Sequence, residues 1–128
     1  MRALVLALLI TSLAQPALAL QIQVGNLYAY CVNWQRDGYS AEFKTNVDGL
    51  NSAFCAAYMS AMSDKGVENC FRLKVDADGK KFVRGWKATK EQLAAAFIKE
   101  TESYPDALKL LPSGFISTFA PQMFPCDQ

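Results

Sequence analysis

The sequence predicts an all-α fold, a compact bundle of about four helices stapled by two disulfides. A basic β-hairpin or loop is expected as an insertion at about residues 71–87. Three observations support this prediction. Apolar residues recur at helical spacing in four segments, four cysteines follow an export signal, and one charged segment interrupts the helical periodicity.

The first 19 residues have the features of a signal peptide. Arg2 supplies a positive charge, residues 3–13 form an apolar run, and Ala17-Leu18-Ala19 fits a cleavage site for signal peptidase. The alternative is a membrane anchor, which needs about 20 apolar residues to span a bilayer. We therefore expect a periplasmic protein, with residues 1–19 removed and residues 20–128 forming one domain.

Two helices are expected in the first half of that domain. The first runs from about Asn26, a plausible N-cap, to Trp34, and the second from about Ser52 to Lys65. Asn51 or Ser52 would cap the second helix, and Gly66 would stop it. The predicted core positions are Leu27, Tyr30, Cys31 and Trp34 in the first helix, and Phe54, Tyr58, Ala61 and Met62 in the second.

Two more helices are expected after residue 87. Thr89 and Gln92 form a capping-box pattern that starts the third helix, and Tyr104-Pro105 ends it. After a short turn, Pro112 suits the first turn of the last helix. The predicted core positions are Leu93, Ala96 and Phe97 in the third helix, and Phe115, Ile116 and Phe119 in the last.

The segment at residues 71–87 breaks the helical pattern. Leu73 and Val75 alternate with charged residues, Asp78-Gly79 forms a turn signal, and apolar residues resume at Phe82. Between residues 71 and 90 there are seven basic residues and two acidic ones. Without Arg2, the 12 remaining basic residues balance the 12 acidic ones, so the overall charge does not point to nucleic acid.

The four cysteines, Cys31, Cys55, Cys70 and Cys126, predict a disulfide framework. Their spacing and the absence of histidine argue against a zinc site. Cys55 lies near the start of the second predicted helix and Cys70 lies five residues beyond its end at Lys65. The two are too far apart to bond, because a disulfide needs Cα atoms about 4.4–6.8 Å apart. We predict Cys31–Cys55 and Cys70–Cys126, and Cys31–Cys70 with Cys55–Cys126 stays open as the alternative.

The residue types favour binding over catalysis. The chain has no histidine, so the usual general base and the Ser-His and Cys-His nucleophile pairs are missing. The stretch Asp76–Gly79 resembles a calcium loop, but Lys74 and Gly85 would stand where that loop requires carboxylates. We predict a protein that is not an enzyme and needs no cofactor or metal.

The basic segment is the candidate partner-binding site. It combines aromatic and positively charged side chains, a mixture typical of interface hot spots. The alternative is a solvated hairpin whose aromatic side chains pack onto the helices. The candidate residues are Lys74, Lys80, Lys81, Phe82, Arg84 and Trp86.

Several stretches together resemble the Rap/Tai family of type VI secretion immunity proteins. CAAYMSAMSD, residues 55–64, resembles the family's C-x-G-Y-I-x-G-V-x-D helix, and ATKEQL, residues 88–93, its V-T-x-x-Q-L helix start. SYPD resembles its H-P-E helix end, and LPSGF with MFPC resembles its closing motifs. All four cysteines match in order. The chain departs from the family at Ala57 and Ala61, which replace glycines, and in the inserted basic segment.

The resemblance implies an all-helical periplasmic protein, often a homodimer, that binds a secreted peptidoglycan amidase effector and blocks its active-site cleft with a protruding element. We expect neither nucleic-acid binding nor membrane insertion after signal removal. Two other functions were weighed. One is an envelope-binding module for an anionic polymer, peptidoglycan or lipopolysaccharide, with no inhibitory role. The other is a small secreted enzyme that uses carboxylates.

Overall fold

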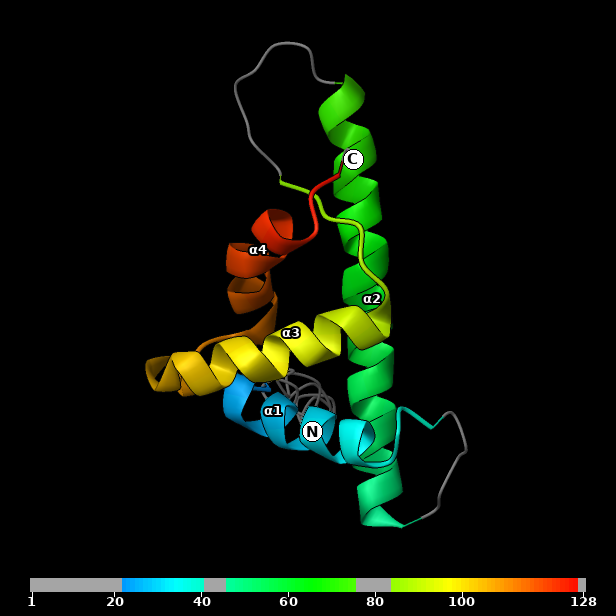
Figure 1. Ribbon diagram of the computed structural model, residues 1–128, viewed down its shortest axis with the longest axis vertical. Helices are drawn as coiled ribbons and strands as arrows, with labels where there is room; N and C mark the ends of the chain where they lie inside the picture. The colour runs from blue at the N-terminus through cyan, green and yellow to red at the C-terminus, as the bar shows by residue number, and fades with distance from the viewer. Residues whose placement is uncertain (1–21, 41–45, 76–83, 127–128) are drawn as a thin grey trace, which may run out of the picture.

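The computed structural model describes residues 22–40, 46–75 and 84–126, with the side chains of 73–75 left out. These residues form an all-α fold that contains no strand. In chain order the elements are α1 (Val24–Arg36), α2 (Val47–Val75), α3 (Lys90–Ser103), the short 3₁₀ helix η2 (Pro105–Lys109) and α4 (Pro112–Met123). Figure 1 shows α2 as a long upright helix that α1 and α3 meet at steep angles, with α4 standing beside it.

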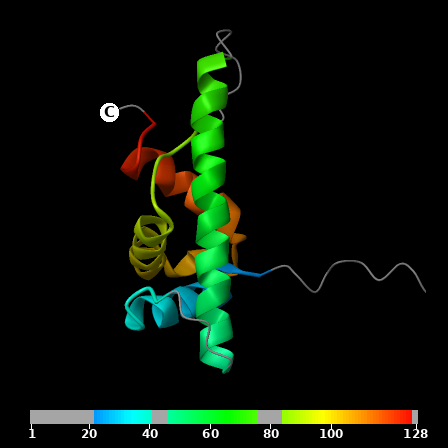
Figure 2. The same cartoon turned by 90° about the vertical axis from the view of Figure 1, so that its right-hand side faces the viewer.

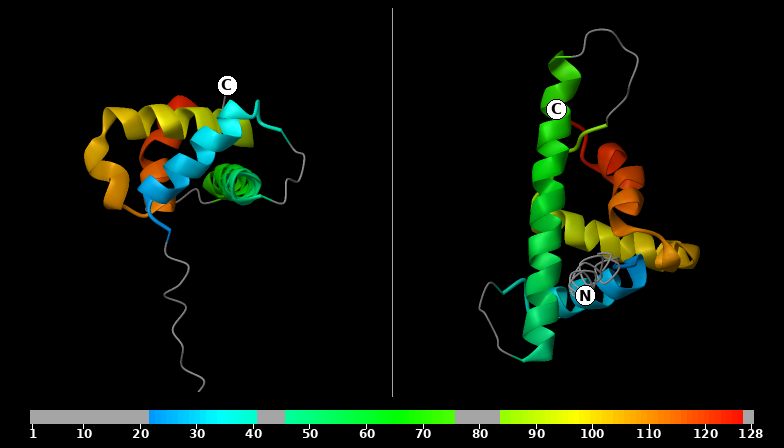
Figure 3. Two further views of the ribbon diagram at one scale, coloured as in Figure 1. Left: turned by 90° about the horizontal axis from the view of Figure 1, so that it is seen from below. Right: turned by 180° about the vertical axis from the view of Figure 1, so that it is seen from behind.

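Helices α1 and α3 pack against one side of α2, and η2 and α4 pack in turn on α1 and α3. In Figure 2, α2 stands in front of the other elements, and the end-on view in Figure 3 shows α1 and α3 side by side on the same side of it. The opposite side of α2 has no covering element among the described residues. None of the described helices is both long enough and apolar enough to span a bilayer.

The core lies where α1, α2 and α3 pack together, and α4 extends it. Helix α1 buries one face made of Val24, Leu27, Cys31 and Trp34, so three of its four predicted core positions are confirmed. Tyr30 is only half-buried and packs edge-on against Phe54. The fully buried side chains with the largest volumes are Trp34, Trp86, Phe97, Leu27, Met59, Leu93 and Ile116.

The starts of α3 and α4 confirm the sequence signals. The Thr89 hydroxyl accepts a hydrogen bond from the Gln92 backbone N–H at 3.1 Å, and the Gln92 side chain accepts one from the Thr89 N–H at 2.9 Å. Pro112 occupies the first turn of α4, where a proline removes no intrahelical hydrogen bond. The three predicted core positions of α3 and the three of α4 are all buried.

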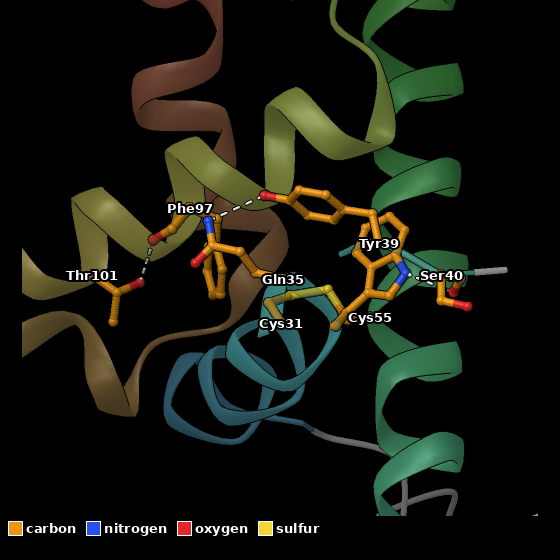
Figure 4. Close-up of a disulfide and its surroundings, with 8 residues drawn as sticks. Cys31, Gln35, Tyr39, Ser40, Cys55, Phe97 and Thr101 are labelled. Carbon is orange, nitrogen blue, oxygen red and sulfur yellow. Dashed lines mark hydrogen bonds between the residues drawn. A yellow bond between two sulfur atoms is a disulfide. The ribbon is translucent and has the colours of Figure 1, made fainter. Parts of the chain in front are cut away.

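Both predicted disulfides are confirmed. Cys31–Cys55 joins α1 to α2 with a Cα–Cα distance of 5.2 Å, and Cys70–Cys126 joins α2 to the C-terminal segment with 5.5 Å. Figure 4 shows the first bond at the crossing of the two helices. Nearby, the Gln35 side-chain amide donates to the Tyr39 hydroxyl, and the Thr101 hydroxyl donates to the Phe97 carbonyl.

The first two helices begin earlier than predicted. The N-cap of α1 is Gln23, whose backbone N–H donates to the Asn26 side chain at 3.3 Å, so Asn26 lies in the first turn. At α2, the Asn46 side chain accepts from the Gly49 N–H at 2.7 Å and takes the capping position expected of Asn51 or Ser52. Ser52 instead lies inside the helix, where its hydroxyl is buried with no partner among the described atoms.

Helix α2 is also longer than the predicted range of Ser52–Lys65. It continues through Gly66 and ends at Val75, so the expected β-hairpin is wrong for residues 71–75, which are helical. Residues 84–89 have no regular secondary structure. The remainder of the predicted insertion, 76–83, lies outside the described residues.

The buried face of α2 differs from the predicted stripe. Met62 is buried as expected and Tyr58 is half-buried, but Phe54 is 43% exposed and Ala61 is exposed. Cys55 faces α1, where it bonds to Cys31. The buried stripe of α2 is therefore offset by about one residue from the predicted stripe. The buried residues of α2 are Gly49, Ser52, Cys55, Met59, Met62, Gly66, Asn69 and Cys70.

Candidate functional site

The six predicted partner-binding residues have different locations. Lys74 belongs to the last turn of α2, and its side chain is not described. Lys80, Lys81 and Phe82 lie outside the described residues. Arg84 is exposed and Trp86 is buried. The structure therefore brings together the two ends of the basic segment, while the proposed contacts of its middle stay a prediction.

Trp86 is a core residue, so its prediction as an exposed aromatic anchor is wrong. Its side chain is 1% exposed, and the indole Nε1 donates to the Met62 carbonyl of α2 at 3.1 Å. The backbone N–H of Trp86 donates to the Gly66 carbonyl at 3.2 Å. For Trp86 the alternative therefore holds, in which an aromatic side chain of the segment packs onto the helices.

The ring of Trp86 fits against α2 because residue 66 is a glycine. A Cβ atom at Gly66 would lie 2.3 Å from the indole Cδ1 and Nε1 atoms, closer than non-bonded atoms can approach. Gly85 permits a second close approach, since a Cβ there would lie 2.3 Å from the backbone nitrogen of Cys70. The chain from residue 85 to 86 therefore lies directly on α2.

Both flanks of the basic segment are fixed to the rest of the molecule. On the N-terminal flank, α2 is helical to Val75 and is held at Cys70 by the disulfide to Cys126. On the C-terminal flank, the Asn69 side chain donates to the Arg84 carbonyl at 3.5 Å, a long contact. The Lys87 N–H donates to the Phe124 carbonyl at 2.9 Å. Residues 76–83 thus connect two anchored ends.

The charge at these ends is mostly unopposed. Arg72 forms an ion pair with Glu68 at 2.7 Å on the exposed surface of α2, so its charge is largely compensated. Arg84 and Lys87 are exposed and form no ion pair with a described residue. The flanks therefore add positive potential to a segment that is itself basic.

A groove between α3, η2 and α4 is a second candidate site, and the sequence reasoning missed it. Its volume is about 750 Å³, within the range typical of ligand sites. Phe115 and Phe119 line it, their rings packed edge-to-face with centroids 5.5 Å apart. Met123 lies at the rim and is 44% exposed. In the sequence, the available signal for this site was Met123, at the end of the apolar helix α4.

The charged side chains that line this groove are Glu100 and Asp106, and both are acidic. Neither forms an ion pair with a basic residue in the part of the chain that the structure describes. Thr118 and Gln122 add a hydroxyl and an amide to the lining. The groove therefore combines an aromatic surface with negative charge.

The outer face of α2 is a third feature of the surface. Leu50 and Phe54 are about half exposed there, and the small side chains of Ala53, Ala57 and Ala61 are exposed beside them. Phe54 also stacks on Tyr58 with ring centroids 6.3 Å apart. A helix that is apolar on both sides is typically covered on both sides.

Two tyrosines have shifted acidities. Burial raises the pKa of Tyr58, against hydrogen bonds with Ser113 that lower it. The pKa of Tyr28 is also raised, by desolvation first and then by its hydrogen bond to the Glu102 carboxylate at 3.2 Å. Neither tyrosine lines the groove. Within the described ranges, no group of three His, Cys, Asp or Glu side chains is placed to hold a metal ion.

Comparisons with known proteins give no relative. No protein-family model, no curated protein and no solved structure matches this chain. The resemblance to the Rap/Tai family rests on the sequence motifs and stays a prediction.

Proposed function

We propose that this is a periplasmic immunity-type protein that binds and inhibits a peptidoglycan amidase effector of type VI secretion. The observation that carries the proposal is the anchoring of the basic segment at both ends, by the Cys70–Cys126 disulfide and by the buried Trp86. The order of the sequence motifs and the two disulfides agree with it.

An inhibitor that blocks a cleft gains affinity when its binding element is ordered before it binds. Association costs free energy for each side chain and loop that becomes fixed in the complex. Here the flanks of the segment are already fixed by the Cys70–Cys126 disulfide and by the buried Trp86, so they add little to that cost. Lys80 and Lys81 would supply charge to an acidic cleft, and Phe82 would supply apolar contact area.

The test is capture of the partner from the producing bacterium. The tagged full chain is expressed in an oxidising periplasm, washed at high salt, and the proteins that co-purify are identified. We expect a stoichiometric amidase whose hydrolysis of peptidoglycan is inhibited by the purified protein. Absence of any hydrolase, or an amidase that keeps full activity in the complex, would refute the proposal.

Charge variants locate the interface. Replacing Lys80, Lys81 and Arg84 by serine should weaken capture at least about tenfold, as expected for the loss of hot-spot contacts. The matched control replaces the exposed Lys99 and Lys109, which lie on α3 and η2, and should leave capture unchanged. Equal affinity of the two variants would remove the basic segment from the interface.

The same experiment separates the envelope-binding alternative, which the excess of basic residues between 71 and 90 favours. Binding of an anionic polymer through surface lysines falls steeply with ionic strength, whereas an interface of packed hot spots persists. Recovery of polysaccharide alone, lost as salt rises, would assign the protein to envelope binding.

The homodimer is proposed to form through the outer face of α2. Its exposed alanines, Ala53, Ala57 and Ala61, are spaced four residues apart on one side of the helix and would allow a second helix to approach closely. We expect sedimentation equilibrium to give a dimer, and Ala57→Arg to give a monomer. The control Ala95→Arg changes an exposed alanine of α3 and should stay dimeric. A monomeric wild-type protein would contradict this arrangement.

A further inference from the structure

We propose that the groove between α3, η2 and α4 binds an extended peptide segment that carries a lysine or arginine next to an apolar side chain. This site is built from residues other than those of the basic segment, so it does not depend on the proposed inhibition of an amidase. Its occupant is identified by the chemistry of the lining alone.

The floor of the groove provides a rigid apolar surface. Phe97, Phe115 and Phe119 form a row of edge-to-face contacts, with ring centroids 6.0 and 5.5 Å apart along the row. Phe97 is fully buried, so it holds Phe115 in place from below. A pocket whose aromatic side chains are already held in place binds an apolar side chain without the free-energy cost of ordering its own side chains.

The rim of the groove exposes apolar side chains. Tyr104, Leu110 and Met123 all line the groove, and each is exposed by 44% or more. These side chains come from the end of α3, the end of η2 and the end of α4. Three separate elements therefore contribute apolar side chains to one rim.

The charge of the groove selects a cation. Glu100 and Asp106 come from α3 and η2, and no basic side chain lines the groove between them. A lysine or arginine of the occupant would complete charge-assisted hydrogen bonds with these carboxylates, which are stronger than neutral ones. An acidic occupant would meet two like charges beside an apolar floor.

The remaining polar groups suit a peptide backbone. The Thr118 hydroxyl donates its proton to the Phe115 carbonyl, and the Gln122 amide makes one long contact, 3.5 Å, with the Thr118 carbonyl. The Thr118 oxygen can still accept, and the Gln122 amide can both donate and accept. A peptide presents both kinds of partner along its length.

Methionine methyl groups give a direct assay. The chain has four methionines. Met59 and Met62 are buried in the core, and Met123 lies at the rim of the groove. The full chain is labelled at its methionine methyl groups and titrated with the acetylated, amidated tetrapeptide Lys-Leu-Phe-Lys. The control peptides are Glu-Leu-Phe-Glu, which reverses the charge, and Lys-Ser-Ser-Lys, which removes the apolar part.

We expect a saturable shift of the Met123 methyl signal with Lys-Leu-Phe-Lys and none with either control peptide. The double variant Glu100→Gln with Asp106→Asn should weaken binding at least about tenfold while the Met59 and Met62 signals stay in place, which shows that it folds. The control Asp64→Asn removes an exposed carboxylate of α2 and should bind as the wild type does.

A second variant tests the charge preference from within the chain. Gln122→Arg places a cation in the groove beside Glu100 and should abolish binding of the peptide by competing for the carboxylates. The proposal is overturned if the Met123 signal does not move. Equal binding of the acidic peptide, or wild-type affinity of the Glu100/Asp106 double variant, would overturn it as well.

Discussion

The contact between Gly66 and Trp86 leads to a sharp prediction for Gly66→Ala. The added methyl group would occupy space 2.3 Å from two atoms of the indole ring, which is rigid and enclosed by the core. Either α2 and the 84–89 segment separate, or the indole leaves its position and its hydrogen bond to the Met62 carbonyl is lost.

The expected size follows from three terms. Overpacking of a filled core costs about 1–3 kcal/mol. A buried indole N–H that loses its acceptor costs about 1–3 kcal/mol more. Alanine gains about 1 kcal/mol over glycine in a helix interior. We therefore expect the free energy of unfolding to fall by about 3 kcal/mol.

Urea denaturation of the oxidised protein measures this loss. With a slope of about 2 kcal/mol per molar urea, the midpoint should fall by about 1.5 M. Tryptophan fluorescence of the native baseline should shift to longer wavelength, because Trp34 and Trp86 are both buried in the wild type. The matched control is Gly114→Ala in α4, where a Cβ would meet no atom within 4 Å. The control should stabilise the protein by up to about 1 kcal/mol. If Gly66→Ala also kept or raised the midpoint, the close packing of Trp86 on α2 would be refuted.

Two further predictions concern the disulfides and the ionisation of tyrosine. Replacing Cys70 and Cys126 together by alanine should lower the free energy of unfolding by about 4 kcal/mol in urea, because the bond spans 56 residues and long loops lose the most chain entropy; a loss under about 1 kcal/mol would contradict this. The raised pKa of Tyr58 means that the folded state holds the phenol proton more tightly, so stability should fall as the pH rises above the ordinary tyrosine value of 10.0. In urea titrations at alkaline pH, the free energy of unfolding of Tyr58→Phe should fall less steeply with pH than that of the wild type. An equal dependence on pH would count against the buried position of the phenol.

The sequence predicted the fold class, the starts of two helices and both disulfides. The helix starts could be predicted because they depend on local chemistry. The capping box at Thr89 and the proline at residue 112 act on their own first turns, so they can be recognised without the rest of the chain. The cysteine pairing followed from which helix ends can meet.

The extent of α2 could not be predicted in this way. The sequence predicts a helix stop at Gly66. In the structure, the indole of Trp86, 20 residues later, occupies the space that a side chain at residue 66 would need. Leu73 and Val75 alternate with charges and were interpreted as a strand, whereas the backbone there continues the helix. At Gly66 a tertiary contact, the packing of Trp86, overrides the local preference for a helix stop.

The same contact explains the misassigned anchor. An aromatic residue between charged neighbours is equally consistent with an exposed hot spot and with a side chain that folds back onto a helix. Only the position of Gly66 and the Met62 carbonyl decides between them. The groove could not be predicted from the sequence. Three elements that meet only in the folded chain bring together Glu100, Asp106 and Met123.

The order of the cysteines along the chain has a consequence for biosynthesis. The first cysteine bonds to the second and the third to the fourth, Cys31 to Cys55 and Cys70 to Cys126. A chain that emerges N-terminus first and is oxidised as it appears therefore forms its native bonds by joining cysteines in the order of their arrival. Such a protein matures without the reshuffling of mispaired bonds, which takes seconds to hours.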